Sequence, residues 1–259
     1  MLKFSPANSK LKKLYKIRQL KKYTDNGKIY SFDLPAGHSC GFAHECHSRA
    51  IEENGSLKIK DFQSTKFRCY AASLEVVFPA TYRLHQSNFS YLRQFKTSED
   101  YYNAIKEFLP KNATVIRCHS SGDFFNENYF KAWLKIAQDN PNKLFYWYTK
   151  ALPYWVNNKE EVDNTPNFIG CASYGGRKDD MILEHGLRYS KVVFSESEAR
   201  KLKLPIDMDD SHASRPDIKH KNLALLIHGV QAAGSEASKA LQKIKKSGKG
   251  GYNKKKVMT

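Results

Sequence analysis

The chain has 259 residues, a formal net charge of +17 and 13% aromatic residues, which fits one α/β domain with a large core. No apolar run approaches the length that spans a bilayer. The N-terminus also lacks the apolar stretch and cleavage site of a secretory signal. We therefore expect a cytoplasmic protein without a membrane segment.

Most of the positive charge lies at the two ends of the chain. Residues 10–22 contain seven basic residues and no acid, and so do residues 243–256. Subtracting these 14 charges from +17 leaves +3 for the rest of the chain. Such ends suit contact with nucleic-acid phosphates, and the alternative is that they only keep the protein soluble. We expect a basic segment over 1–27, an α/β domain over 28–246 and a basic flexible tail over 247–259.

Short apolar runs alternate with amphipathic stretches along the middle of the chain. In residues 126–139, apolar side chains recur at helical spacing. The apolar runs are nearly continuous, as in strands buried on both faces of a parallel sheet. We predict a partial (β/α)6 barrel-like parallel sheet in one domain, with an open doubly wound sheet as the alternative. The expected strands are 28–33, 113–118, 144–148, 167–171, 191–194 and 223–227.

Polar and reactive residues follow five consecutive predicted strands. In parallel α/β folds the carboxyl ends of the strands are where functional sites form, so we expect one shared site. His119 and Asp123 are candidates for acid–base or metal chemistry, and Lys150 for binding a carboxylate or phosphate. The other strand-end candidates, for cofactor binding, are Ser121, Gly122, Ser173, Glu196 and His228.

Five cysteines, an odd number without an export signal, argue against a disulfide framework. Cys40, Cys46 and Cys69 lie in a loop expected over residues 38–72. Three thiolates suit a four-iron cluster with one iron open to substrate. The alternative is zinc, with donors completed from a group of nearby histidines. Those histidines are His38, His44 and His47.

A short helix is expected directly after the third cysteine. Ser73 is its predicted cap, and Leu74, Val77 and Phe78 are its predicted inner face. A cysteine just before a helix N-terminus gains from the helix dipole, which stabilises the thiolate.

Three segments carry a resemblance to a known family. Residues 33–40 (DLPAGHSC), Cys69-Tyr70-Ala71 and residues 121–124 (SGDF) resemble the phage "gene product 88" family, over roughly residues 5–245. This resemblance implies a phage-encoded protein in the host cytoplasm.

The layout is also similar, more distantly, to that of the radical S-adenosylmethionine enzymes. That similarity implies a six-unit partial barrel, with Cys40, Cys46 and Cys69 binding three irons of a [4Fe–4S] cluster. It further implies that Asp123 accepts hydrogen bonds from the ammonium of S-adenosylmethionine. The chain departs from the family in lacking its compact cysteine motif and in having Asp in place of Glu. The alternatives within a related fold are loss of the cofactor and exchange of the cluster for zinc.

The leading hypothesis is a phage-type iron–sulfur enzyme with S-adenosylmethionine as cofactor. The first alternative is a non-enzymatic nucleic-acid-binding protein with a structural zinc, suggested by the basic ends and the nearby histidines. The second alternative is a metal-dependent nuclease that uses His119 and Asp123. The sequence names neither the substrate nor the oligomeric state.

Overall fold

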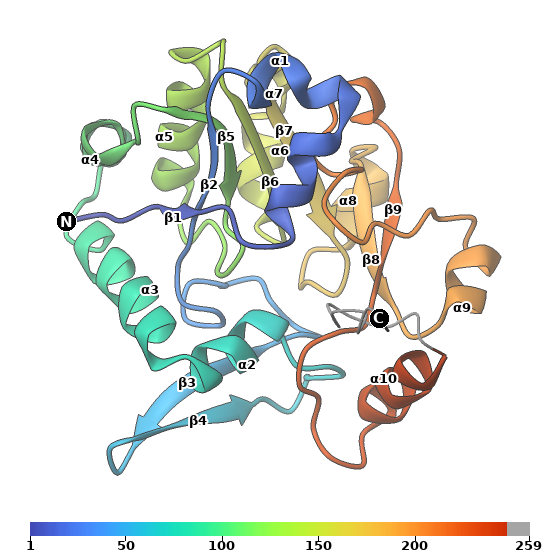
Figure 1. The fold of residues 1–259 in the computed structure, drawn as a ribbon. Helices are drawn as coiled ribbons and strands as arrows, with labels where there is room; N and C mark the ends of the chain where they lie inside the picture. Colours follow the sequence, from blue (N-terminus) through green and yellow to red (C-terminus); the bar gives the residue numbers. More distant parts are fainter. Residues whose placement is uncertain (248–259) are drawn as a thin grey trace, which may run out of the picture.

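The computed structural model describes residues 1–247, and its centre is a seven-stranded sheet (Figure 1). The strands are neighbours in the order β1-β2-β5-β6-β7-β8-β9. The edge strand β1 is antiparallel to β2, and the other six strands are parallel. Their bounds are β1 (Ser5–Pro6), β2 (Lys28–Phe32), β5 (Ala113–Cys118), β6 (Leu144–Thr149), β7 (Phe168–Ser173), β8 (Tyr189–Val193) and β9 (Leu223–Leu226).

The six parallel strands are neighbours in space in the order in which they occur along the chain. A doubly wound sheet has a point at which the strand order reverses, and the described residues contain no such reversal. The sheet is therefore wound in one direction and curls into a half-barrel with the edge strands β1 and β9 (Figure 1). The prediction of a single α/β domain with a six-stranded parallel sheet is confirmed at this level.

Helices cover one face of the sheet, and the largest core of the protein lies beneath them. Helix α5 (Glu127–Gln138) begins after Asn126, whose side-chain oxygen accepts the N–H of Tyr129 at 2.8 Å. Its fully buried Trp133 packs with Trp147 of β6 in the same core cluster. Helix α4 (Ser98–Phe108) directly precedes β5. The other helices that follow β5 are α6 (Leu152–Asn157), α7 (Lys159–Asp163), α8 (Asp180–Glu184), α9 (Glu196–Lys201) and α10 (Glu236–Lys246).

The N-terminal segment covers part of the opposite, inner face of the sheet. It forms the 3-10 helices η1 (Leu11–Lys16) and η2 (Arg18–Leu20) and the helix α1 (Lys21–Thr24). Leu11, Leu14 and Leu20 are fully buried there, and they pack in one cluster with inward side chains of β2, β5, β6 and β7. The lysines between these leucines are exposed, so the segment is amphipathic. The expected basic tail lies outside the described residues, apart from Ser247.

A long insertion joins β2 to β5. It contains the antiparallel hairpin β3 (Ser48–Glu53) and β4 (Ser56–Asp61), then α2 (Tyr70–Val77), α3 (Pro79–Leu92) and α4. The hairpin turn has Asn54 at φ 51° and Gly55 at φ 74°, the positive values that a tight two-residue turn requires. Ser48 pairs with Asp61 at the base of the hairpin, so the chain leaves the hairpin next to the point at which it enters.

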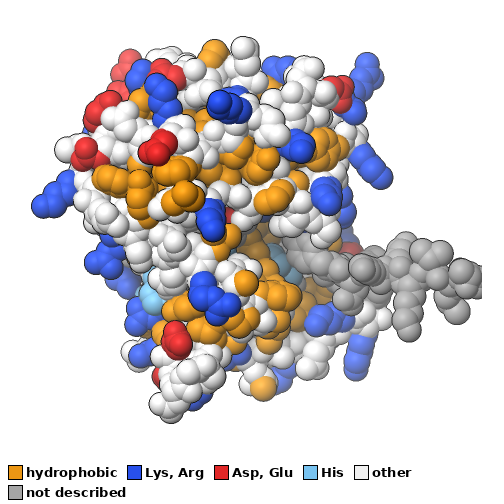
Figure 2. Space-filling view, turned by 60° about the vertical axis from the view of Figure 1, so that its left-hand side comes forward, with side chains coloured by type: hydrophobic (Ala, Val, Ile, Leu, Met, Phe, Trp, Pro, Cys, Tyr) orange, Lys and Arg blue, Asp and Glu red, His pale blue; other side chains and the backbone are white. Residues whose placement is uncertain are grey.

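Helix α2 differs from its prediction. It begins at Tyr70 with Cys69 in the N-cap position, and Ser73 lies inside it and donates to the carbonyl of Val230 at 3.0 Å. The predicted inner face was wrong, since Leu74, Val77 and Phe78 are 43%, 56% and 54% exposed. Figure 2 shows hydrophobic side chains at the surface in the lower half of the molecule, where α2 lies. No described helix is both long and apolar enough to cross a membrane.

Candidate functional site

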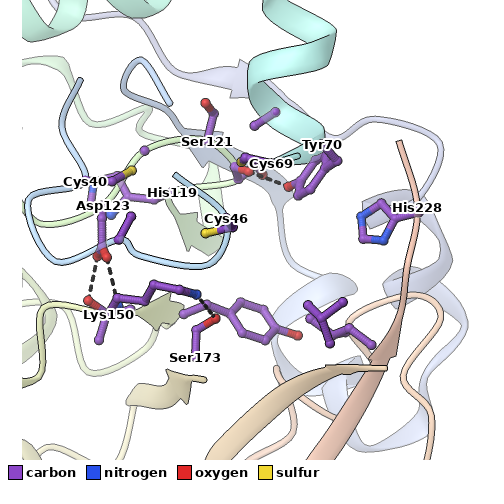
Figure 3. Close-up of a pocket in the computed structure, with 18 of the residues that line it drawn as sticks. Cys40, Cys46, Cys69, Tyr70, His119, Ser121, Asp123, Lys150, Ser173 and His228 are labelled. Carbon is purple, nitrogen blue, oxygen red and sulfur yellow. Dashed lines mark hydrogen bonds between the residues drawn. The ribbon is translucent and has the colours of Figure 1, made fainter. Parts of the chain in front are cut away.

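A pocket of about 980 Å³, its open mouth included, lies at the carboxyl ends of the parallel strands. Its wall combines the cysteine loop, the start of α2, and the turns after β5, β6 and β9. Of the residues predicted from the sequence, it brings together Cys40, Cys46, Cys69, His119, Ser121, Gly122, Asp123, Lys150, Ser173 and His228 (Figure 3). Glu196 is not among the wall residues; it lies in the first turn of α9, 3.6 Å from Arg200.

The three loop cysteines lie around the same part of the pocket (Figure 3). The hairpin explains why Cys46 and Cys69 lie close together, because it lies between them in the chain and its two ends are paired. The N–H of Cys69 also donates to Ser48 Oγ, at the start of the hairpin, at 2.9 Å. Backbone N–H groups point at two of the sulfurs, from Gly37 to Cys40 at 3.4 Å and from the first turn of α2 to Cys69. Such donors stabilise a bound thiolate.

Burial is the main influence on the pKa values of two of these thiols, Cys40 and Cys69. It raises the pKa of Cys40 well above the ordinary value, and nearby Asp123 and Cys69 raise it further. Burial and the neighbouring Cys46 raise the pKa of Cys69 to about 12. The thiols of Cys40 and Cys69 are therefore protonated near neutral pH, and binding a positively charged metal centre would release their protons.

The histidines of the loop are directed elsewhere. His38 Nε2 lies 2.8 Å from the carbonyl oxygen of Ala50, and the ring of His47 stacks on Phe62 with centroids 3.8 Å apart. Neither these two nor His44 lines the pocket. Within residues 1–247, no group of three or more His, Cys, Asp or Glu side chains is close enough to hold a single metal ion.

Asp123 lies on the turn after β5, on the same side of the pocket as Cys40 (Figure 3). Its carboxylate accepts hydrogen bonds from Thr149 Oγ1 at 2.5 Å, from Lys150 N–H at 2.8 Å and from Phe124 N–H at 2.8 Å (Figure 3). Burial raises the pKa of Asp123, and these donors limit the rise. The preceding Gly122 has φ +83°, and an added Cβ would lie 2.6 Å from Ser39 Oγ and 2.7 Å from Leu34. This position therefore requires glycine.

Lys150 provides a buried positive charge beside the thiols. Its Nζ donates to Ser173 Oγ at 2.6 Å, which joins the ends of β6 and β7 (Figure 3). Burial acts to lower the pKa of Lys150, but the negative charges available on Cys46 and Asp123 outweigh it, and the pKa is raised. A fixed ammonium at this place can pair with a carboxylate or phosphate of a bound molecule.

His119 is buried and His228 is half-buried, and both are neutral imidazoles near neutral pH. His119 Nε2 lies 2.9 Å from Tyr129 Oη, and its ring meets Phe124 edge-on. Burial and the charge of Arg117 lower the pKa of His119 to about 3. The ring of His228 lies 4.7 Å from that of Tyr70, and burial lowers the pKa of His228 to about 4.

These two histidines make the stability of the fold depend on pH. In the unfolded chain each histidine binds a proton below about pH 6.5, whereas in the folded chain His119 and His228 do so only near pH 3 and pH 4. The contribution of the two histidines to stability is therefore fully present above about pH 6.5, and it decreases as the pH falls below that value. For His119 we expect a loss of roughly 2 kcal/mol between pH 6.5 and 4.5. Urea unfolding at both values measures it, and His119→Asn, which tolerates the φ of 68°, is expected to flatten the dependence. An unchanged slope in that variant would contradict this assignment.

Several residues of the site escaped the sequence analysis. Lys10, Arg117 and Asp210 form a buried ion cluster in the pocket wall. Glu75 of α2 is fully buried, and its Oε1 accepts hydrogen bonds from Ala36 N–H at 3.1 Å and from Ser121 Oγ at 2.9 Å. Glu75 thus joins α2, the cysteine loop and the turn after β5. No local motif marks these residues, because their partners lie far away in the chain.

Fold and site together define the class of protein. It is an α/β half-barrel with a three-cysteine pocket at the carboxyl ends of its parallel strands. Residues 2–248 match the sequence model of the family called Gene product 88, and the chain belongs to that family.

One relative comes from a virus of mycobacteria. The "Gene 88 protein" of Mycobacterium phage L5 is 31% identical to this chain over 91 residues, which cover 32% of this chain. The match spans 38% of that relative's own length. No solved structure matches the chain.

Proposed function

We propose that this protein is an iron–sulfur enzyme in which Cys40, Cys46 and Cys69 bind a [4Fe–4S] cluster and S-adenosylmethionine is the cofactor. The observation that carries the proposal is that three thiols, from positions up to 29 residues apart (69 − 40), meet in one pocket. Cys118, by contrast, is fully buried in the main core and does not line the pocket. Packing alone gives no reason for the first three to gather at a cavity.

The donor set favours a cluster over a single zinc ion. A tetrahedral zinc site needs four donors, with sulfurs about 3.8 Å apart for bonds of about 2.3 Å. In a four-iron cluster each cysteine binds a different iron, so three thiols around a wider space suffice and the fourth iron stays open. The wall residues here supply three thiols without a histidine from the loop. The N–H groups directed at Cys40 and Cys69 also suit a cluster, whose properties depend on hydrogen bonds to its sulfurs.

The remaining wall residues suit an amino-acid group placed beside the cysteines. When bound, the cluster would supply the electron that starts radical chemistry on S-adenosylmethionine. Asp123 would accept hydrogen bonds from the ammonium of this cofactor, and Lys150 would pair with its carboxylate. Ser173 holds the Lys150 ammonium, and Thr149 and the Lys150 N–H hold the Asp123 carboxylate. Both charged groups are therefore fixed before a ligand arrives, which lowers the cost of binding.

Asp123→Asn tests the cofactor part of the proposal. The substitution keeps the shape of the side chain but removes the charge that would pair with an ammonium, so we expect S-adenosylmethionine to bind at least about tenfold more weakly. Calorimetric titration of reconstituted protein measures the affinity, and the absorbance of the cluster shows that iron is still bound.

The control is Asp180→Asn, the same change at an exposed residue in the first turn of α8. It is expected to leave the affinity unchanged. Equal affinities for the wild type and Asp123→Asn would remove Asp123 from the cofactor site.

A further inference from the structure

The pocket has a second charged region, separate from the cysteines. Lys10 Nζ lies 2.6 Å from one oxygen of Asp210, and Arg117 Nη1 lies 2.5 Å from the other. Tyr146 Oη also donates to Asp210, at 3.0 Å. The three charged side chains are 13%, 8% and 1% exposed, and all of them line the pocket.

This cluster lies at the His228 end of the pocket. The charges that act on His228 are those of Lys10, Arg117 and Asp210. Figure 3 places His228 across the pocket from Cys40 and Asp123. Cys40 and Asp123 therefore lie toward one end of the cavity and the ion cluster toward the other.

The charges of this cluster do not balance. Lys10 and Arg117 carry two positive charges and Asp210 one negative charge, which leaves +1. Asp207, on the same loop as Asp210, is not part of the wall, and its carboxylate accepts backbone N–H groups of His212 and Ala213. Of the four basic residues in the whole wall, Arg68 is already paired with Asp61 at 2.8 Å, so the other three face two acids, a formal balance of 3 − 2 = +1. The four basic residues are Lys10, Arg68, Arg117 and Lys150, and the acids are Asp123 and Asp210.

We propose that the end of the pocket formed by Lys10, Arg117 and Asp210 binds a phosphate group of the substrate. This deepens the proposed function, on which it rests for the reaction, by assigning the substrate to phosphorylated small molecules. An ammonium and a guanidinium on one buried carboxylate offer several N–H donors to an oxyanion. The negative charge of a phosphate group would also compensate the excess positive charge of the wall, and a buried excess charge is costly without such compensation.

The N-terminal segment takes part in this site. Lys10 directly precedes the buried leucines of η1, so the packing of Leu11 and Leu14 on the inner face of the sheet carries its ammonium to Asp210. At least one of the seven basic residues over 10–22 is therefore directed into the pocket.

The test compares inorganic phosphate binding to the full chain and to Lys10→Gln, by calorimetry at constant ionic strength. Removing one of two charged donors is expected to weaken phosphate binding by at least about tenfold. Lys12→Gln is the matched control, since Lys12 is an exposed lysine two positions away, and its affinity is expected to stay within about twofold. Arg117→Lys keeps the charge and the pairing with Asp210, and it is expected to weaken binding while the fold is kept.

Three results would overturn the proposal: no phosphate binding by the wild type at millimolar concentrations, equal losses in Lys10→Gln and Lys12→Gln, or binding of acetate in place of phosphate. Each titration is made with and without reconstituted iron. If the wild type binds phosphate but takes up no iron during reconstitution, the iron–sulfur proposal is refuted and the phosphate site is supported. If the wild type takes up the cluster but does not bind phosphate, the phosphate site is refuted and the iron–sulfur proposal is supported.

Discussion

Replacing Cys40, Cys46 and Cys69 together with serine is expected to abolish iron binding. The wild-type chain, reconstituted anaerobically with iron and sulfide, should hold about four irons and about four sulfides. The triple variant should hold none, because serine supplies no thiolate and no other wall residue supplies a soft ligand. Each single variant should lose most of the iron, since two thiols hold a cluster poorly. Iron and sulfide analysis, with the visible absorbance, measures the effect.

Cys171→Ala provides the matched control for the cysteine variants. Cys171 is 1% exposed in β7 and does not line the pocket. Its loss is expected to leave the iron content unchanged. Full iron content in the triple variant, or loss of iron in Cys171→Ala alone, would contradict the assignment of the three ligands.

Asp210→Ala is expected to have the largest effect on stability. Asp210 is the shared partner of two buried cations, and removing one partner of a buried ion pair costs about 3–5 kcal/mol. For a chain of this size that lowers the melting temperature by roughly 10 °C. Chemical and thermal unfolding measure the change.

The control for this substitution is Asp25→Ala, which also removes the partner of a lysine in the N-terminal segment. The Lys21–Asp25 pair is 3.0 Å apart, but both side chains are about half exposed. Its loss is expected to cost less than about 1 kcal/mol. Similar losses of stability for the two variants would show that the ion cluster at Asp210 is not a buried network.

The sheet could be predicted from the sequence because its strands are marked locally. The apolar runs at 113–118 and 144–148 coincide with β5 and β6 to within a residue, since strands buried on both faces are mostly apolar. That the strand-end residues meet could also be predicted, because the carboxyl ends of parallel strands lie at the same edge of the sheet. Glu196 is the exception: β8 ends at Val193, and α9 carries Glu196 away from the pocket.

The residues that connect the site could not be predicted in the same way. The sequence places Lys10 only in a basic end of the chain, because its ion-pair partner Asp210 lies 200 residues away (210 − 10). The buried Glu75 and the exposed Leu74 of α2 reverse the usual preference of their residue types. The cost of burying Glu75 is offset by its hydrogen bonds to Ala36 and Ser121, which only the folded chain brings near.

One signal in the sequence was present and was overlooked. Asn54-Gly55 is a dipeptide typical of a two-residue hairpin turn, and the residues that follow it, Leu57-Lys58-Ile59-Lys60, alternate between apolar and charged. A hairpin returns the chain to its starting point, so it predicts that Cys46 and Cys69 are neighbours despite the gap between them. The long spacing of the third cysteine is thus explained by an inserted structural element.

The central claim is that Cys40, Cys46 and Cys69 form one binding centre for an iron–sulfur cluster. Metal and sulfide analysis of the wild-type chain, purified without oxygen, tests it most directly. We expect iron and sulfide in nearly equal amounts, with a broad visible absorbance. One equivalent of zinc without iron, or a colourless protein even after reconstitution, would contradict the claim.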